Sequence, residues 1–515
     1  MSETELKLVL DEATANAVWG RARALKLATQ KPVRRTLRSI YFDTPDHALK
    51  AAGISLRLRR DGRRWIQTVK IRAGLHGGLS QAEEVESPAP GGKLCIDAIP
   101  VEAVRAEVSR RVDGAALHPV CETLIERRAG RVSLADGTLA ELAVDIGDIR
   151  AAGRSAELRE AEIELLEGSP AGLFGVAGML FPEGGLHFSR FSKAARGYLL
   201  AETGAIDPPL EPRNALPTNP RRGLTAEQAA QDVLRECFDQ IATNMLVVRA
   251  LNDLEGPHQL RVGLRRLRSV FSVHASVLGG AEMERLAGEA RWLGQEVGLL
   301  RDLDVAADAI VRREAERHPD EPGLMVLAQA LSERAGGQRR QLRVLLAEGR
   351  AQRFLLDLAC FAETRGWLAA GASDQPRRPA PAVADLAGAA LARCWKKVRR
   401  RAKGLESLDV EQRHELRKAL KKLRYAVEFF AALYPKKRVA PFLKRLKRLQ
   451  LVFGDLNDAA TVKAMLSDAS LAGGDIVVHR AVGWMLGASQ ARAELGWTGA
   501  KALWRELHET RPFWE

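Results

Sequence analysis

Charged residues recur at every second position in several short segments of the first 200 residues. Glu3, Glu5 and Lys7 are spaced in this way, and so are Arg57 and Arg59. Successive side chains of a β-strand point to opposite faces, so each set projects from one face of its strand. Carboxylates bind hard divalent cations such as Mg²⁺, whereas guanidinium and ammonium groups bind phosphate oxygens. A barrel with these faces inward would suit phosphoryl chemistry, which needs a metal and phosphate side by side.

The same region contains enough β-rich segments for such a barrel. We predict strands at 3–10, 37–42, 54–60, 64–72, 79–86, 131–135, 139–146 and 160–166, separated by Gly and Asp-Gly turns. Helical patterns interrupt them at 11–27, 45–51, 99–111 and 170–181. Eight or so strands with few helices indicate a barrel or a sandwich. For any single strand, the alternative is an ordinary amphipathic sheet with its charged face in water.

Length and composition narrow the class of protein. The chain has 515 residues, enough for about three domains, with 46% apolar and 28% charged residues. It has no apolar run long enough to cross a membrane, and its start is acidic where a signal peptide is basic. Its five cysteines lie far apart and form no CxxC motif, which argues against a disulfide framework or a thiolate zinc site. We therefore expect a cytoplasmic protein with no membrane partner.

The strand-rich region resembles the CYTH superfamily, the triphosphate tunnel metalloenzymes. Glu3-x-Glu5-x-Lys7 matches the ExExK signature of this family, which alone is a weak signal. Further matches follow in the family's order over nearly all of residues 1–200: YFDTPD (41–46), Leu-Arg-Leu-Arg (56–59), Thr68-Val-Lys70, Asp145-x-Gly147, Glu162-Ile-Glu164 and the segment from Ser192 to Gly197. The resemblance implies an antiparallel eight-stranded β-barrel that forms a tunnel and carries helices (α+β). It also implies a triphosphate-bearing substrate and Mg²⁺ or Mn²⁺.

The resemblance further implies roles for individual residues. The metal or the attacking water would be held by Glu3, Glu5, Asp145, Glu162 and Glu164. Phosphates would be bound by Lys7, Arg57, Arg59, Lys70, Arg128 and Lys193. Catalysis would depend on Glu5, Lys7, Glu162 and Glu164, because a carboxylate must orient water for in-line attack on the terminal phosphorus. Glu84 stands where the family has an acid, and Glu86 is a further candidate.

Three positions leave alternatives open. Arg128 is taken as the family's mid-barrel arginine, although Arg127 is adjacent to it. Arg196 either faces the tunnel or caps the terminal helix. Relatives often carry an arginine just before the acidic strand, where this chain has Gln81 and Ala82. One phosphate contact would then be missing, which would weaken binding or shift the preferred substrate length.

A Pro-rich linker at 203–224 separates this first domain, residues 1–202, from a helical region at 225–515. A second Pro-rich break at 373–383 divides that region into related halves, at about 225–372 and 384–515. His258, Arg261, Arg265 and Arg268 recur 156 residues later as His414, Arg417, Lys421 and Arg424. The same offset aligns Leu293, Gly298, Leu300 and Asp302 with Leu449, Gly454, Leu456 and Asp458. We therefore predict a multidomain chain whose C-terminal part is a duplicated antiparallel all-α bundle.

Each copy of the repeat places its basic residues on one helix face, with spacings of three and four. Like charges one turn apart repel, so a bound polyanion or nearby acids, such as Asp302 and Asp458, must offset them. Residues 201–515 hold 50 Lys+Arg against 39 Asp+Glu, and residues 391–450 alone hold 20 against 5. This excess favours a polyanionic partner over the alternative of a merely solvated basic surface.

The basic helices and the Gly-x-x-Arg/Asn-Asp turns resemble the CHAD domain (conserved histidine α-helical domain) in both halves. That resemblance implies a basic channel that binds inorganic polyphosphate. Its lining would include His258, Arg261, Arg265, Arg268, His414, Arg417, Lys421 and Arg424, and residues 435–448 would extend the basic surface.

Both regions therefore indicate condensed phosphate as the ligand. The leading hypothesis is metal-dependent hydrolysis of inorganic triphosphate to diphosphate and phosphate, with polyphosphate bound by the CHAD region. That region would deliver substrate or place the enzyme on polyphosphate granules. The alternatives are a catalytically weak polyphosphate-binding scaffold and another CYTH activity, such as thiamine triphosphatase or adenylate cyclase. Nucleic acid is disfavoured as a partner, because no base-stacking aromatic residues interleave the basic faces.

Overall fold

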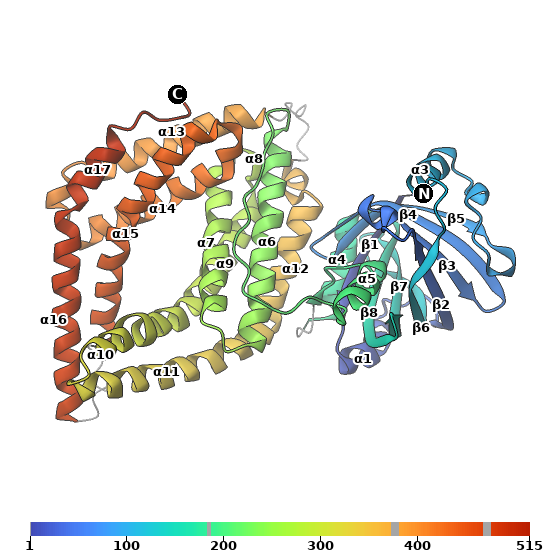
Figure 1. Ribbon diagram of the computed structural model, residues 1–515, viewed down its shortest axis with the longest axis horizontal. Helices are drawn as coiled ribbons and strands as arrows, with labels where there is room; N and C mark the ends of the chain where they lie inside the picture. Colours follow the sequence, from blue (N-terminus) through green and yellow to red (C-terminus); the bar gives the residue numbers. More distant parts are fainter. Residues whose placement is uncertain (1, 183–186, 372–380, 467–474) are drawn as a thin grey trace. The chain divides into compact units, whose positions relative to one another are not determined.

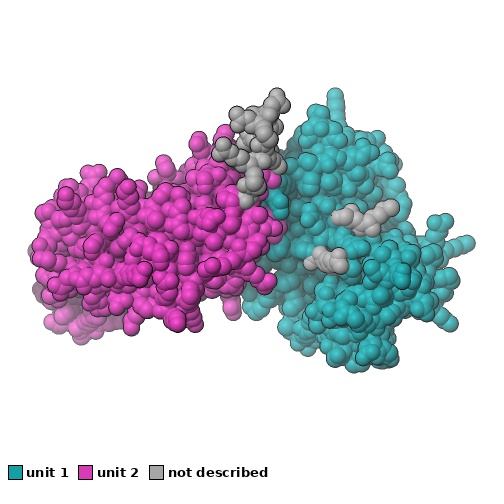
Figure 2. Space-filling view, turned by 90° about the horizontal axis from the view of Figure 1, so that it is seen from above, with its two compact units in different colours: residues 1–210, 347–365 teal, residues 211–346, 366–515 magenta. Residues whose placement is uncertain are grey.

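The computed structural model describes residues 2–182, 187–371, 381–466 and 475–515 (Figure 1). The chain forms two compact units, which Figure 2 shows in different colours. The first comprises residues 1–210 and 347–365, and the second comprises residues 211–346 and 366–515. In the part of the chain that the structure describes, no helix has both the length and the apolar character needed to cross a membrane.

The first unit is built around a closed barrel of antiparallel strands (Figure 1). These are β1 (Ser2–Val9), β2 (Val33–Asp43), β3 (Ser55–Asp61), β4 (Arg64–His76), β5 (Leu79–Pro88), β6 (His118–Ser133), β7 (Leu139–Ala151) and β8 (Arg154–Glu167). They pair in the order β5-β4-β3-β2-β6-β7-β8-β1, and pairing of β1 with β5 closes the sheet. A short strand, β9 (His187–Phe188), adds to the edge of β1. The predicted eight-stranded antiparallel barrel is confirmed.

Helices on the outside of the barrel explain why its charged residues face inward. Helices α1 (Glu12–Ala24) and α4 (Pro170–Leu180) pack on β8, and α4 also packs on β1, where Leu6 and Leu8 are fully buried. Over β3, β4 and β5, α3 (Glu102–Val112) completes an apolar core. Every second residue of these strands enters an outer apolar layer, so the residues between them face the interior.

Strand β6 is much longer than the sequence pattern indicates. We predicted a strand at 131–135, whereas β6 runs from His118 to Ser133 and pairs along β2 and β7. The consecutive charges of Arg127 and Arg128 break the alternation that marks a half-buried strand. They do so because this strand carries charge on both of its faces, one toward the interior and one toward solvent.

Helix α5 (Lys193–Thr203) lies against β6 and β7 and carries residues to the barrel interior. Its N-terminus is capped by Ser192, whose side chain accepts a hydrogen bond from the Ala195 N–H. Its closest approach to β6 is at Gly197, where an added Cβ would lie 2.0 Å from Cys121 Sγ. Glycine is therefore required at this position for α5 to reach the site.

Asp43 gives the YFDTPD stretch a structural role in this fold. Its buried carboxylate accepts hydrogen bonds of 2.6–2.9 Å from the backbone N–H groups of Thr44, Leu49 and Lys50 and from the Tyr198 hydroxyl. These bonds tie the end of β2 to α2 (Ala48–Ala51) and to α5. The stretch thus positions α5 through Asp43, and Tyr41 at its start interacts with Arg57 of the charged interior.

The second unit is helical and repeats itself (Figure 1). The first half contains α6 (Ala226–Ala250), α7 (Glu255–Val273), α8 (Ala275–Leu278), α9 (Ala281–Asp304), the π-helical segment η3 (Val305–Arg312), α10 (Arg313–Arg317) and α11 (Pro322–Ala347). The second half contains α13 (Val383–Arg401), α14 (Val410–Phe430), α15 (Lys436–Leu466), α16 (Ile476–Thr498) and α17 (Ala500–His508). Adding 156 to the bounds of α7 gives 411–429, which nearly reproduces α14. The predicted all-α duplication is confirmed.

The remaining elements are short or connecting. Helix α12 (Gly349–Glu363) follows α11 in sequence but belongs to the first unit, where it packs against α4. Short 3₁₀ turns are η1 (Pro90–Gly92), η2 (Ile96–Ala98), η4 (Gly366–Gly371), η5 (Leu405–Ser407) and η6 (Ala431–Leu433). The Pro-rich segment before α6 has neither helix nor strand over 204–224, and Arg213 within it binds Glu236 of α6 through two contacts of 2.8 Å.

Candidate functional site

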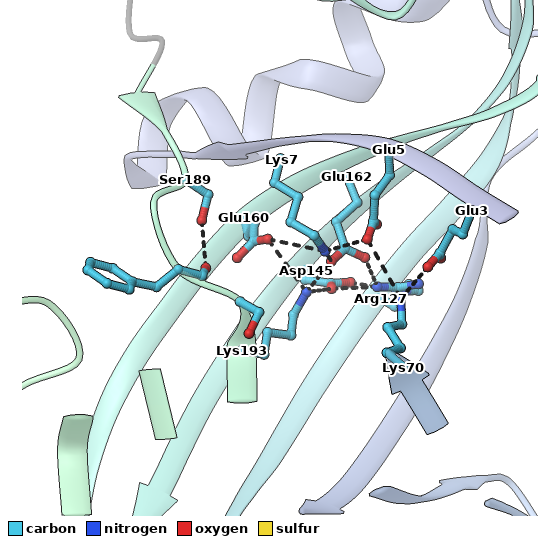
Figure 3. Close-up of polar contacts among 12 residues, drawn as sticks. Glu3, Glu5, Lys7, Lys70, Arg127, Asp145, Glu160, Glu162, Ser189 and Lys193 are labelled. Atoms are coloured by element: carbon cyan, nitrogen blue, oxygen red, sulfur yellow. Dashed lines mark hydrogen bonds and ion pairs between the residues drawn. The ribbon is translucent and has the colours of Figure 1, made fainter. Parts of the chain in front are cut away.

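Ion pairs fill the centre of the barrel interior (Figure 3). Lys7 Nζ lies 2.9 Å from Glu5 Oε1 and 2.6 Å from Glu162 Oε1. Strand register produces this meeting, because β1 pairs with β8 and places Lys7 directly opposite Glu162. All three side chains are buried. The structure therefore brings together three of the residues predicted to be central to catalysis.

Arg127, Asp145 and Lys193 complete this centre (Figure 3). The Arg127 guanidinium makes two hydrogen bonds of 2.7–2.8 Å to the Asp145 carboxylate and also contacts Glu162. Lys193 Nζ, from α5, lies 2.9 Å from Asp145 Oδ2 and 2.6 Å from Glu162 Oε1. Burial alone would raise the pKa of Glu162, but Lys193, Lys7 and Arg127 hold it well below its usual range. Glu162 is therefore an anion that three cations share.

Arg128 does not belong to this centre. The prediction that it is the mid-barrel arginine is therefore wrong. Its side chain lies on the outer face of β6, is about one-third exposed and pairs with Glu126 at 3.4 Å. Arg127 has the opposite orientation because successive residues of a strand alternate between faces. In the register of β6 with β7, Arg127 stands opposite Asp145, whereas Arg128 stands opposite Val144. Arg127 is thus the inward-facing arginine.

Glu160 is an interior residue that sequence reasoning did not select. It is fully buried, and within the described part of the chain neither carboxylate oxygen has a hydrogen-bond partner. Its nearest cations are Arg196 Nη1 at 3.7 Å, Lys193 Nζ at 3.8 Å and Lys7 Nζ at 4.0 Å. Burial raises the pKa of Glu160. The two-residue spacing from Glu162 would have been sufficient to place it on the inner face.

Arg196 faces the interior rather than capping the end of its helix. It lies in the first turn of α5, is only 2% exposed, and points to Glu160 and to the Ser189 hydroxyl. Of the two alternatives left open by the sequence, the structure therefore supports the tunnel-facing one.

A second group of ion pairs connects β1, β3, β4 and β5. Lys70 contacts Glu3 and lies 2.8 Å from Glu84 Oε2 and 3.7 Å from Glu5 Oε1. Arg57 Nη2 lies 3.2 Å from Glu84 Oε1, and Arg59 Nη2 lies 2.8 Å from Glu86 Oε1. The shared contact with Glu5 makes this group continuous with the one around Glu162.

Ala82 lies on the same inner face, opposite Glu3 in the register of β1 with β5. An arginine at this position would stand beside Glu3 and add a cation to the interior. The chain instead has a buried methyl group there, so this part of the wall offers no side-chain contact for phosphate.

The acids of the interior form a donor set that fits a hard divalent cation. Burial, a hydrogen bond with Glu84 and the charge of Glu5 raise the pKa of Glu3 to about 8. Burial and the charges of Glu5 and Glu141 raise the pKa of Glu164. A cation would relieve both effects, and carboxylate oxygens are the ligands that Mg²⁺ and Mn²⁺ prefer. No three such side chains of the described residues already converge as ligands, because most of these carboxylates are turned toward lysine or arginine.

The basic faces of the helical unit also meet. On α7 and α14, Lys421 is surrounded by arginines from both copies of the repeat. Burial and the charges of Arg265, Arg417, Arg261 and Arg424 lower the pKa of Lys421 to about 6. Arg265 Nε donates a 2.8 Å hydrogen bond to the Tyr425 hydroxyl, which links the two helices directly. We call Arg261, Arg265, Arg417, Lys421 and Arg424 the basic cluster.

The other predicted residues of the basic faces border this cluster to different degrees. Burial and the charge of Arg301 lower the pKa of His258, and burial and the charge of Lys418 lower that of His414. Arg268 lies about two turns beyond Arg261 along α7, and it neighbours Arg291 of α9 rather than Lys421.

Two members of the basic cluster have acidic partners among the described residues in the contacts that follow. Arg261 pairs with Asp302, as the repeat pattern indicated, and Arg424 lies 3.8 Å from Glu428. The side chain of Asp458, the other predicted partner, lies outside the described residues. The two copies therefore bring their positive charge together around Lys421.

Comparison with known protein families assigns both regions. Residues 1–198 match the CYTH domain, and residues 232–467 match the CHAD domain. The chain is a CYTH–CHAD fusion. Every residue predicted for the barrel site lies within the CYTH match, and every residue predicted for the polyphosphate site lies within the CHAD match.

The CYTH–CHAD protein has full-length and partial relatives. It is 26% identical over 504 residues to an uncharacterized protein of Mycobacterium tuberculosis, covering 91% of this chain and 89% of that protein. It is 29% identical over 169 residues to the inorganic triphosphatase of Haemophilus influenzae, covering 32% of this chain and 46% of that enzyme. The crystal structure of the CHAD domain from the plant Ricinus communis has a TM-score of 0.51 and 26% identity, covering 58% of this chain and 98% of that one.

Proposed function

We propose that the CYTH domain hydrolyses inorganic triphosphate to diphosphate and phosphate with Mg²⁺ or Mn²⁺, and that the CHAD domain binds inorganic polyphosphate. The observation that supports the enzyme most strongly is the barrel interior itself, in which carboxylates and cations from seven strands and α5 form one continuous network. The partial relative in Haemophilus influenzae is named an inorganic triphosphatase, which supports the choice of substrate.

The cations of the network would bind the phosphate chain. Lys7, Arg57, Arg59, Lys70, Arg127 and Lys193 each lie next to a carboxylate. Phosphate oxygens would replace these carboxylates as partners, so the side chains are already held near the positions where they are needed. Their fixed positive charges would stabilise the charge that spreads over the phosphoryl oxygens in the transition state.

The carboxylates would divide between metal binding and orientation of water. Glu3, Glu5, Asp145, Glu162 and Glu164 would hold the metal, which supplies neutralisation of phosphate charge and polarisation of bound oxygen. Glu164 has no hydrogen-bond partner in the described part of the chain, and its pKa is raised. Its carboxylate is therefore the best placed to accept a hydrogen bond from the attacking water.

Polyphosphate binding by the CHAD domain rests on the basic cluster. Burial lowers the pKa of Lys421 most, and the repulsion from the neighbouring arginines lowers it further. A polyanion would remove that repulsion, and each additional phosphate contact would strengthen binding in a salt-dependent way. In this proposal the CHAD domain delivers substrate or keeps the enzyme on polyphosphate granules in the cytoplasm.

The enzyme proposal is tested by phosphate release from tripolyphosphate with Mg²⁺ or Mn²⁺, with ATP, thiamine triphosphate and long-chain polyphosphate assayed in parallel. Glu162→Gln and Glu5→Gln should each abolish release while the protein stays folded. Glu126→Gln is the matched control, because Glu126 lies on the outer face of the barrel and pairs with Arg34. Unchanged release in both interior variants would contradict the metal role. Absence of release by the wild-type protein, with tight polyphosphate binding, would show a scaffold instead.

A further inference from the structure

A cavity of about 460 Å³ lies in the first half of the CHAD domain, between the end of α9, the segment η3 and helix α11. Its charged and amide lining comes from Asn252, Asp304, Asp308, Arg312, Arg339, Arg340 and Arg343. None of these residues belongs to the repeated basic motif or to the basic cluster. The volume is in the range of pockets that bind small molecules.

A π-helical segment shapes one wall of this cavity. Segment η3 spans Val305–Arg312, directly after Asp304. π-helical turns are rare and frequently mark functional sites, because they displace side chains from regular α-helical positions. The apolar side of η3 packs on α11 through Ala306, Ala307 and Val311, which fixes the wall. The opposite side of the segment can therefore present Asp308 and Arg312 to the cavity.

Two of the arginines are held rigidly by neighbouring groups. Arg339 donates to the Asp304 carboxylate at 3.1–3.2 Å and to the Asp253 carbonyl at 3.0 Å. Arg343 donates to the carbonyl oxygens of Val248 and Leu251 and to Asn252 Oδ1, at 2.7–3.0 Å. The partners of Arg343 are neutral, so these bonds orient its guanidinium without cancelling its charge.

The cavity keeps an excess of positive charge. Arg312 pairs with Asp308 at 2.9 Å, and Arg339 pairs with Asp304. Arg340 has no hydrogen-bond or ion-pair partner among the described residues. Two arginine charges, those of Arg340 and Arg343, are therefore left without an acid at a cavity that small molecules can enter.

The second copy of the repeat lacks this arrangement. At the offset of 156 residues, the positions of Asp304 and Asp308 hold Ala460 and Ala464, and those of Arg339, Arg340 and Arg343 hold Leu495, Gly496 and Gly499. The basic faces of α7 and α14, in contrast, keep their charge in both copies. The charged lining of the cavity is thus present in the first copy of the repeat and is not shared by the second copy.

We propose that this cavity is a second anion site, which binds a compact ligand through a diphosphate group. Two adjacent phosphates match the two uncompensated guanidinium groups, because Arg340 can form paired hydrogen bonds to phosphate oxygens. The Nη1 group of Arg343, which the bonds to Val248, Leu251 and Asn252 do not use, can donate to the second phosphate. A volume of about 460 Å³ suits inorganic diphosphate or the diphosphate portion of a nucleotide rather than a long chain. The site is independent of the barrel and does not rest on its proposed activity.

The cavity offers a matched pair of variants for the test. Gly336 lines it, and a Cβ added there would meet no atom closer than 3.8 Å. Gly337 is the next residue of the same helix, does not line the cavity, and has similar room at 3.9 Å. Gly336→Leu should therefore fill the cavity without disturbing the fold, and Gly337→Leu should leave the cavity open. Replacing glycine within a helix also favours helix formation in both variants.

The experiment is calorimetric titration of the full chain with inorganic diphosphate and, separately, with ADP, in EDTA. We expect Gly336→Leu and Arg340→Ala each to weaken binding by at least tenfold, and Gly337→Leu to bind as the wild type does. Binding of both probes assigns the diphosphate group as the ligand, and tighter binding of ADP assigns a nucleotide. No binding by the wild type, or equal binding by the two glycine variants, would overturn the proposal. An equal loss of long-chain polyphosphate binding in Gly336→Leu would also overturn it, because the cavity would then be part of the polyphosphate surface.

Discussion

The two domains place positive charge in opposite surroundings. In the CYTH barrel, Lys7, Lys70, Arg127 and Lys193 each contact at least one carboxylate within 3 Å. In the CHAD domain, the pKa of Lys421 is lowered to about 6 by burial and by four arginines. The barrel cations are compensated before any ligand binds, whereas the basic cluster retains repulsion that a ligand can relieve.

This difference indicates two ways of binding condensed phosphate. A phosphate chain that enters the barrel must displace carboxylates, so we expect it to bind together with a cation that those carboxylates can hold. A chain that binds the basic cluster removes the repulsion around Lys421 directly. We therefore expect the barrel to require a metal for tight binding and the CHAD domain not to require one.

The largest effect should come from the inward-facing arginine of the barrel. Arg127→Ala removes contacts to Asp145 and Glu162 and a cation from the proposed phosphate site, so kcat for tripolyphosphate should fall by about 10²–10³. Arg128→Ala, one residue along the strand, should change kcat by less than about twofold, because its side chain is on the outer face. Phosphate-release kinetics measure both. Equal effects of the two substitutions would contradict the orientation of β6 as the basis of the site.

The second-largest effect should show that polyphosphate binding and triphosphate hydrolysis depend on different domains. The double substitution Arg261→Glu with Arg417→Glu reverses two charges of the basic cluster, so polyphosphate affinity should fall by about 100-fold at moderate salt, with triphosphatase activity unchanged. Arg285→Glu with Lys501→Glu makes the same charge change at exposed positions and is the control. Retained polyphosphate binding in the first variant, measured by titration, would argue against the basic cluster as the binding site.

Polyphosphate binding should also depend on pH. Lys421 has a pKa of about 6 in the free protein, because burial and the neighbouring arginines disfavour its charged form. A bound polyanion favours that form and raises the pKa, so binding takes up a proton. Affinity should therefore increase about tenfold as the pH falls from 8 to 6 and change less below pH 6. Titrations in buffers of different ionisation enthalpy measure the proton uptake. Lys421→Gln should abolish most of it, and persistence of the full pH dependence would refute this assignment.

The smallest effect should come from Ala82, which lies on the inner face of β5 opposite Glu3. Ala82→Arg would place a cation on the inner face of β5 and could contact both Glu3 and a phosphate. We expect the KM for tripolyphosphate to fall a few-fold, with kcat within about twofold of the wild-type value. An unchanged KM for Ala82→Arg would show that this part of the wall does not face the substrate.

Periodicity in the sequence predicts most of the barrel site. Alternation along β1, β3 and β8 was enough to orient Glu5, Arg57 and Glu162, because each of these strands has one apolar and one charged face. It failed along β6, where Arg127 and Arg128 are consecutive and charge occupies both faces. Choosing between them requires the register with β7, which depends on long-range pairing that the local pattern does not contain.

Other features depend on tertiary structure rather than on motifs. Glu160 follows the same alternation as Glu162, which is enough to place it on the inner face, but its burial beside Lys193 and Arg196 depends on how α5 packs on the barrel. The repeat offset predicted where α14 lies, and the convergence of both basic faces on Lys421 required the packing of α7 on α14. The sequence pattern does not predict the cavity beside η3, because its arginines come from α11 and from a π-helical turn, neither of which matches the repeated motif.

The two domains differ most in that the barrel, whose cations are paired with carboxylates, should need a metal to bind condensed phosphate, whereas the basic cluster should not. We would titrate the full chain with imidotriphosphate, an analogue that resists hydrolysis, and with long-chain polyphosphate, each in Mn²⁺ and in EDTA. We expect EDTA to weaken binding of the triphosphate analogue by at least tenfold and to leave binding of polyphosphate unchanged. Equal binding of the analogue with and without Mn²⁺, or loss of polyphosphate binding in EDTA, would contradict it.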